Sequence, residues 1–149
     1  MTTLNSGDKA PDFHSQDQEG NPVSLSDFKG KKLVIFFYPK ASTPGCTAQA
    51  CNLRDNWQMF KDKGFEILGV SADSKKRQQK FRENYDLPFP LLADEEKEVI
   101  NAYGVWGPKK FMGKVYDGIH RTTFIIDEAG NIEDIIDNVK TKEHASQIL

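Results

Sequence analysis

The chain has 149 residues, a length that predicts one domain spanning residues 1–149. Apolar residues make up 38% of it and charged residues 28%, a balance that allows a buried core and excludes a disordered protein. With 20 basic and 22 acidic residues the net charge is −2, so no overall attraction draws the chain to nucleic acids or anionic membranes.

The sequence carries no pattern for targeting or for crossing a membrane. Its N-terminus lacks both the basic start and the apolar stretch of a secretory signal. The longest apolar run, residues 33–38, is much shorter than the about 20 residues that a bilayer requires. These features predict a cytoplasmic protein with no membrane and no nucleic acid among its partners.

The first predicted elements are an irregular opening and a buried strand. Residues 7–13 are rich in turn formers, residues 23–25 fit a short strand or an extended lead-in, and residues 26–28 allow at most one helical turn. Residues 33–38 are β-branched and aromatic without alternation, which predicts a strand buried on both faces, as in a parallel sheet.

A helix and a second buried strand are predicted next. Residues 47–61 have helical periodicity, and one stripe of the helix is apolar: Cys46, Ala50, Leu53, Trp57 and Phe60. Gly64 ends this helix, and residues 65–71 form the second buried strand.

The following segment alternates helices and short extended pieces. Asp73 or Ser74 can cap a helix that runs to about Tyr85, and residues 91–92 are extended. Asp94 then caps a helix through about Tyr103. Residues 104–118 contain four glycines and a proline, which predicts a long loop.

The C-terminal elements are a hairpin and a helix. Residues 122–126 and 132–136 are predicted strands joined by a turn, and a last helix begins near Thr141. Strand–helix–strand crossovers give a parallel part of the sheet, and the hairpin adds an antiparallel part. The whole order predicts an α/β protein with a thioredoxin-like three-layer fold, in which helices cover both faces of a mixed central sheet.

Cys46 stands where a buried strand has ended and a helix begins. The start of a helix presents unpaired N–H groups and about half a positive charge, which favours a thiolate over a thiol. Pro44 and Gly45 stiffen the loop and let backbone N–H groups approach the sulfur. The apolar stripe that includes Cys46 equally fits a buried, inert cysteine, so both interpretations remain open on position alone.

Cys51 follows five residues later in the same predicted helix. On an intact α-helix that spacing separates the two Cα atoms by about 8.6 Å, whereas a disulfide requires about 7 Å or less. Either the two cysteines never bond, or the first turn of the helix unwinds to bring them together. Helix ends open more easily than helix centres, so the second course is physically accessible.

The cysteines and histidines do not predict a metal site. Structural zinc sites combine closely spaced cysteines with further cysteines or histidines, and His14, His120 and His144 are scattered along the chain. Two cysteines this close together also do not form the framework of a secreted protein, whose disulfides join distant segments.

The residues around Cys46 also resemble a known family. Pro39, Thr43 and Cys46 match the Pro-x3-Thr-x2-Cys signature of the peroxiredoxins, and residues 43–51 resemble the PrxQ group, also called bacterioferritin comigratory protein. The likeness extends over nearly the whole chain, including residues 10–13, 103–107 and 116–127.

The resemblance implies a thiol-dependent peroxidase with two redox-active cysteines. Cys46 is then the peroxidatic cysteine, which attacks hydrogen peroxide or an organic hydroperoxide and becomes a sulfenic acid. Cys51 is the resolving cysteine, which forms an intramolecular disulfide with it. Thioredoxin, or glutaredoxin, is the expected reductant, the expected assembly is a monomer, and no metal, haem or flavin is implied.

The resemblance also implies which groups support the reaction. The Thr43 hydroxyl, the backbone N–H groups near Gly45 and Cys46, and Arg121 are expected to bind the substrate and stabilise the departing oxygen. Pro39 is expected to shield the sulfur from water, and Gln49 to help hold the arginine.

Other functions make different predictions. A dithiol–disulfide oxidoreductase on the same fold should have Cys-x-x-Cys at the helix start, and here the second cysteine comes two positions too late. A non-enzymatic peroxide sensor or redox-regulated holdase should react slowly with peroxide and not turn over with thioredoxin. A purely structural protein should not react at all.

Overall fold

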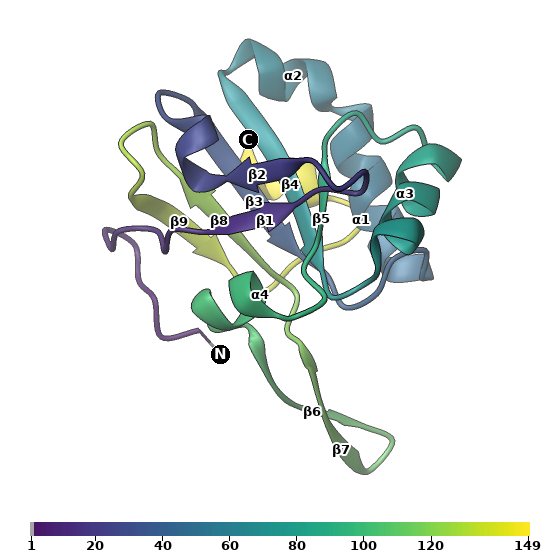
Figure 1. Cartoon of the computed structure of the whole chain (residues 1–149). Coiled ribbons are helices and arrows are strands. Elements are labelled where there is room, and N and C mark those ends of the chain that lie inside the picture. The colour runs from purple at the N-terminus through teal and green to yellow at the C-terminus, as the bar shows by residue number, and fades with distance from the viewer. Residues whose placement is uncertain (1) are drawn as a thin grey trace.

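The centre of the fold is a five-stranded mixed sheet, shown in Figure 1 by a computed structural model that describes residues 2–149. Its strand order is β5-β4-β3-β8-β9. The parallel strands are β3 (Lys32–Phe37), β4 (Phe65–Ser71) and β5 (Leu91–Ala93), and the antiparallel ones are β8 (Thr122–Ile126) and β9 (Ile132–Ile136).

Four helices cover one face of this sheet. They are α1 (Pro44–Asp55), α2 (Trp57–Asp62), α3 (Lys75–Asn84) and α5 (His144–Ile148). Each contributes to the same buried cluster as Val34 and Phe36 of β3, through Ala50, Phe60, Phe81 and Ala145 respectively.

The opposite face is covered by smaller elements. They are β1 (His14–Gln16), β2 (Pro22–Ser24), the 3-10 helix η1 (Leu25–Phe28) and α4 (Glu98–Ala102). Val23 and Ile100 pack there with Leu33, Ile35 and Phe37 of β3. The predicted three-layer arrangement with a mixed sheet is therefore confirmed, and every residue from 33 to 37 is fully buried because β3 is covered on both sides.

Several predicted elements are confirmed closely. The strands at residues 65–71, 122–126 and 132–136 have the predicted bounds. Helix α3 begins after Ser74, whose hydroxyl accepts a hydrogen bond from the Arg77 N–H at 3.2 Å.

The predicted helix over residues 47–61 is in fact two helices. Helix α1 begins earlier, at Pro44, and the path breaks at Asn56 before α2. The Asn56 side-chain amide donates to the Asn52 carbonyl at 2.8 Å, so it competes for a carbonyl that the backbone would use. Apolar spacing continues across the break, which is why the sequence pattern did not show it.

The predicted long loop over residues 104–118 is wrong. This segment forms an antiparallel hairpin of β6 (Trp106–Phe111) and β7 (Lys114–Ile119) that projects from the body of the molecule (Figure 1). Met112 and Gly113 make its two-residue turn, with φ values of 51° and 79°. Its side chains are mostly exposed, so no apolar alternation marked the two strands.

The last two predicted helices are shorter than expected. Helix α4 begins only at Glu98, because Lys97 has a left-handed φ of 59°, yet the Asp94 carboxylate still accepts from the Ile100 N–H at 2.8 Å. Helix α5 begins at His144, three residues after the predicted start. Within residues 2–149, no helix combines the length and the apolar character that a membrane span requires.

Candidate active site

Cys46 lies in the first turn of α1, as predicted from the position of Pro44 and Gly45. Thr43 precedes the helix in an extended conformation, and Pro44 is its first residue, where proline's fixed φ suits a helix start. The first backbone bond runs from the Thr47 N–H to the Thr43 carbonyl at 2.8 Å. The N–H groups of Gly45 and Cys46 therefore precede the first hydrogen bond of the helix, at the end that carries a partial positive charge.

Arg121 lies against the sulfur of Cys46. Strand β8 pairs antiparallel with β3, and Thr122 is opposite Phe37, so the start of β8 lies beside the end of β3 that leads to α1. The Arg121 Nη2 donates to Cys46 Sγ at 3.4 Å. Cys46 is only 1% exposed, and this guanidinium contact means that the sulfur is not enclosed by hydrocarbon alone.

Gln49 holds the other half of the Arg121 guanidinium. It is buried one helical turn after Cys46, and its Oε1 accepts from Arg121 Nη1 at 2.6 Å. Within the described chain its Nε2 finds no hydrogen-bond partner, which is costly for a buried amide. The geometry thus brings three predicted residues together: Cys46, Gln49 and Arg121.

Gly45 leaves space for that arginine. A Cβ atom at position 45 would lie 3.3 Å from Arg121 Nη2, tighter than an ordinary contact. A larger residue would therefore displace the guanidinium by a few tenths of an ångström. The glycine allows this close approach without such a shift, and no positive φ calls for it at this position.

The Thr43 hydroxyl does not point its proton at the sulfur. It donates to the Lys40 carbonyl at 2.8 Å. A threonine hydroxyl has one proton and two lone pairs. In this arrangement Thr43 can accept a hydrogen bond from a bound hydroperoxide, whereas the resemblance led us to expect a donor to the departing oxygen.

Pro39 borders a groove beside the site. With Lys40 it forms one wall of a groove of about 390 Å³, and the base of the β6–β7 hairpin, including Trp106, Lys109 and Tyr116, forms the other. Pro39 is partly buried in this position. We call this space the hairpin groove.

The loop before α1 is held by a buried network that the sequence analysis missed. The Asp73 carboxylate accepts from the Ala41 N–H and from the Ser71 hydroxyl, both at 2.7 Å. Gln78 donates to Ser71 at 2.9 Å and accepts from the Tyr38 hydroxyl at 2.5 Å. Burial raises the pKa of Tyr38, so its phenol stays protonated and keeps donating.

The network has a recognisable origin in the sequence. Strands β3 and β4 are parallel, so the loop after β3 and the residues after β4 meet at one edge of the sheet. On that ground a carboxylate just after β4 can be assigned to the loop, whereas the local sequence around Asp73 predicts only a helix cap.

Cys51 differs from Cys46 in its surroundings. Both are free thiols on the intact helix α1, and Cys51 is half-buried. Burial raises the pKa of the Cys51 thiol; Arg54 lowers it and Asp55 raises it further. Cys51 is therefore held mainly as the protonated thiol at neutral pH, whereas the sulfur of Cys46 accepts a hydrogen bond from the Arg121 guanidinium.

The C-terminal segment is hydrogen-bonded to α1 at Asn52, the residue directly after Cys51. The Asn52 side chain donates to the Lys142 carbonyl at 3.0 Å and accepts from the Ala145 N–H at 2.7 Å. Unwinding that brings Cys51 to Cys46 must involve residues 43–51, and it can stop before Asn52 without breaking these two bonds.

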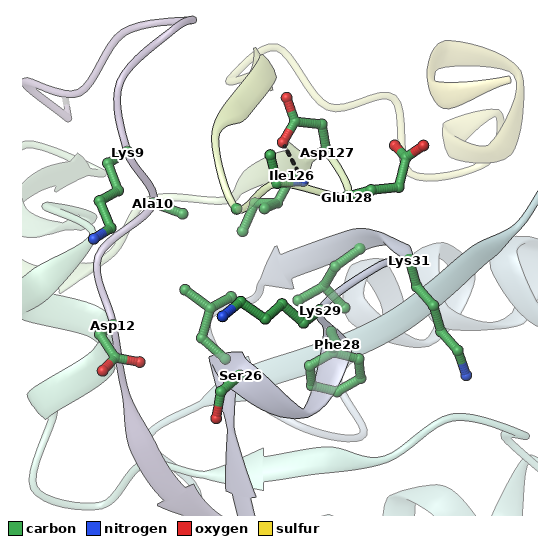
Figure 2. A pocket seen from close by; sticks show the side chains of 14 residues that line it. Lys9, Ala10, Asp12, Ser26, Phe28, Lys29, Lys31, Ile126, Asp127 and Glu128 are labelled. Atoms are coloured by element: carbon green, nitrogen blue, oxygen red, sulfur yellow. Dashed lines mark hydrogen bonds between the residues drawn. The ribbon is translucent and has the colours of Figure 1, made fainter.

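A second, mainly apolar pocket lies far from this chemistry. It has a volume of about 170 Å³ and includes Leu33, at the end of β3 opposite the loop that leads to Cys46. Figure 2 shows Lys9 and Ala10 on one side of it and Phe28 and Lys29 on another. None of the residues predicted for the active site lines this pocket.

Comparisons with known proteins give the family of the chain. The AhpC/TSA family model matches residues 6–135. Peroxiredoxin Bcp of Escherichia coli is 49% identical over 149 residues, which cover all of this chain and 96% of that protein.

Solved structures agree with this assignment. Bacterioferritin comigratory protein of Xanthomonas campestris superposes with a TM-score of 0.90 at 32% identity, over 99% of this chain and 94% of that one. Peroxidoxin BcpB of Mycobacterium tuberculosis gives 0.85 at 36% identity, over 97% and 93%. The chain therefore belongs to the AhpC/TSA family, as a thiol-dependent peroxidase of the peroxiredoxin group named PrxQ or bacterioferritin comigratory protein.

Proposed function

We propose that this peroxidase reduces hydrogen peroxide and organic hydroperoxides with Cys46, resolves the product with Cys51 and is recycled by thioredoxin. The observation that carries the proposal is the contact of Arg121 Nη2 with Cys46 Sγ at 3.4 Å in the first turn of α1. The similar bacterioferritin comigratory protein of Xanthomonas campestris has alkyl peroxide reduction activity, which supports organic hydroperoxides as substrates.

The first step transfers one oxygen atom to sulfur. The Cys46 thiolate attacks the terminal oxygen of ROOH, the S–O bond forms, and the O–O bond breaks. The sulfur is oxidised by two electrons to a sulfenic acid, and the departing RO⁻ takes up a proton and leaves as an alcohol or as water. Arg121 and the N–H groups of Gly45 and Cys46 stabilise the negative charge that moves from sulfur to the departing oxygen; the Arg121–Cys46 contact and the position of both N–H groups at the helix start support these roles.

The second step joins the two cysteines within one chain. The first turn of α1 unwinds, the Cys51 thiolate attacks the Cys46 sulfenic sulfur, and hydroxide leaves and is protonated to water. Because one helix carries both sulfurs, a monomer can complete the cycle. A thioredoxin dithiol then reduces the disulfide; glutaredoxin is the alternative donor, and the cytoplasm, where such donors keep thiols reduced, is the proposed location.

The proposed function is tested by turnover with defined reductants. The reduced protein is mixed with hydrogen peroxide or an alkyl hydroperoxide, and NADPH consumption is followed with a thioredoxin system, a glutaredoxin system or neither. We expect sustained turnover with thioredoxin. Oxidation without turnover in either system would instead identify a peroxide sensor or holdase.

Thr43 provides a prediction about the substrate's O–H group. Thr43→Val removes the acceptor and should lower the second-order rate constant with hydrogen peroxide about 10- to 100-fold, as expected for one well-placed hydrogen bond in a transition state. Thr43→Ser keeps the hydroxyl and should retain most of the rate. Stopped-flow kinetics of the two variants checks this, and equal rates for valine and threonine would show that the hydroxyl is not used.

Cys51 provides a prediction about pH. Because burial raises the pKa of its thiol, the thiolate fraction at neutral pH is small and grows as pH rises toward that pKa. The rate of disulfide formation after a fast first step should therefore rise with pH, up to tenfold per unit, while the Cys51 thiol remains mostly protonated. Double-mixing stopped-flow between about pH 6 and 9 measures this, and a disulfide step that slows with rising pH would contradict it.

A further inference from the structure

One cation near the active site has no part in the chemistry described so far. Lys109 lies on β6 and lines the hairpin groove together with Pro39. It is half-buried, whereas its neighbours Lys110 and Lys114 on the same hairpin are exposed. Its Nζ donates to the Ile119 carbonyl at 2.9 Å, so it is held at the end of β7, two residues before Arg121.

A glycine allows Lys109 to reach that carbonyl. A Cβ atom at Gly118 would lie 3.2 Å from Lys109 Cδ, because the lysine side chain crosses β7 directly over this residue. Glycine weakens a strand unless something must approach the backbone closely. At Gly118 the group that approaches is the alkyl chain of Lys109.

Electrostatics link Lys109 to both members of the reactive pair. Burial lowers the pKa of its ammonium, the Arg121 guanidinium lowers it further, and the Cys46 thiolate raises it. The ammonium is thus within electrostatic range of Arg121 and of Cys46. The other charged groups of the groove are Lys40, Asp73 and Asp117, and Asp73 already accepts two hydrogen bonds.

We propose that Lys109 is a positioning residue for the peroxidase reaction. Its hydrogen bond to the Ile119 carbonyl, made across Gly118, fixes the β7–β8 connection that carries Arg121 and so keeps Arg121 against Cys46. Its ammonium also adds a second positive charge near these two residues. This inference rests on the proposed function. The hydrogen bond from Lys109 to the Ile119 carbonyl limits the movement of the β7–β8 connection. A second cation in a site with little water stabilises both the thiolate and the negative charge that develops on the departing oxygen.

The test compares five variants of the full-length protein: Lys109→Met, Lys109→Arg, Gly118→Ala, the double variant of Lys109→Met with Gly118→Ala, and Lys110→Met. Two quantities are measured: the second-order rate constant for hydrogen peroxide, and the pH midpoint of Cys46 alkylation mapped by mass spectrometry. Circular dichroism melting confirms that each variant is folded. Lys110→Met is the matched control, because it removes an exposed lysine from the adjacent position, which points to the other face of the hairpin.

Lys109→Met should lower the rate constant about tenfold and move the alkylation midpoint to higher pH, since it removes one partly solvated charge near the sulfur. Gly118→Ala should cause part of the same loss by displacing the lysine, and the double variant should be no worse than Lys109→Met alone. Lys110→Met should match the wild type, and Lys109→Arg should restore most of the rate and the wild-type midpoint.

Three results would overturn the inference while the proposed function stands. Lys109→Met could react as the wild type does; it could lose rate with no change in the alkylation profile, as a purely structural residue would; or the losses in the double variant could simply add. A wild-type protein that fails to consume peroxide would instead overturn the proposed function itself.

Discussion

Replacing Cys46 with serine should reduce peroxide consumption to the background of buffer. A serine hydroxyl is not ionised at neutral pH and has no thiolate form that can take the oxygen. Burial raises the pKa of the remaining thiol, Cys51, more than Arg54 lowers it, so this thiol stays protonated. Stopped-flow mixing of the reduced variant with hydrogen peroxide, followed by a thiol count, measures this directly.

The matched control is Cys51→Ser, which keeps Cys46 with Arg121 and Gln49 in place. It should react with peroxide at about the wild-type rate but stop at one sulfenic acid per chain, which a 1,3-diketone reagent traps. In the wild type, one equivalent of peroxide should remove both thiols. If Cys46→Ser consumed peroxide as fast as wild type, the two cysteines would have been assigned the wrong roles.

Replacing Arg121 with methionine should produce the second large effect. The side chain is charged, and its Nη2 donates to Cys46 Sγ at 3.4 Å. Removal of one well-placed donor from a transition state lowers rates about 10²- to 10³-fold, and the loss of a full positive charge adds to this. The second-order rate constant with hydrogen peroxide should therefore fall by at least about a hundredfold.

Two further variants separate charge from geometry at Arg121. Arg121→Lys keeps the charge, but it lacks the planar fork that contacts Cys46 and Gln49 together, so it should recover only part of the rate. Gln49→Leu leaves the arginine unanchored and should lose less than Arg121→Met. A rate for Arg121→Met within twofold of the wild type would show that the guanidinium contact has no catalytic role.

The core strands of this fold could be predicted from local sequence because burial on both faces leaves a simple pattern. Strand β3 is a continuous run of large apolar residues, and it is the central strand, fully buried from residue 33 to 37. The position of Cys46 at a helix start also followed from local features, since Pro44 and Gly45 directly precede it.

The residues that complete the site could not be derived from local sequence. Arg121 is 75 positions from Cys46, and only the antiparallel pairing of β8 with β3 brings the two together. That pairing depends on tertiary structure, so Arg121 and Gln49 were expected only because of the family resemblance. The Thr43 hydroxyl was expected to donate to the departing oxygen, and its actual partner, the Lys40 carbonyl, depends on the turn that the loop adopts.

The β6–β7 hairpin shows a different limit. Its register is regular from Trp106 opposite Ile119 to Phe111 opposite Lys114. Its strands are exposed, however, so they lack the apolar alternation by which a strand is recognised. The glycines that suggested a loop have specific uses instead: Gly113 forms the turn, and Gly118 makes room for Lys109.

Amide hydrogen exchange tests whether α1 must unwind for Cys46 and Cys51 to form a disulfide. The exchange rates are compared between the reduced protein and the protein oxidised by one equivalent of peroxide. The intact helix keeps the cysteines too far apart to bond, so the disulfide form should exchange much faster over residues 43–51, while β3, β4 and β8 remain as protected as before. A disulfide form in which that turn of α1 is as protected as in the dithiol form would contradict this account.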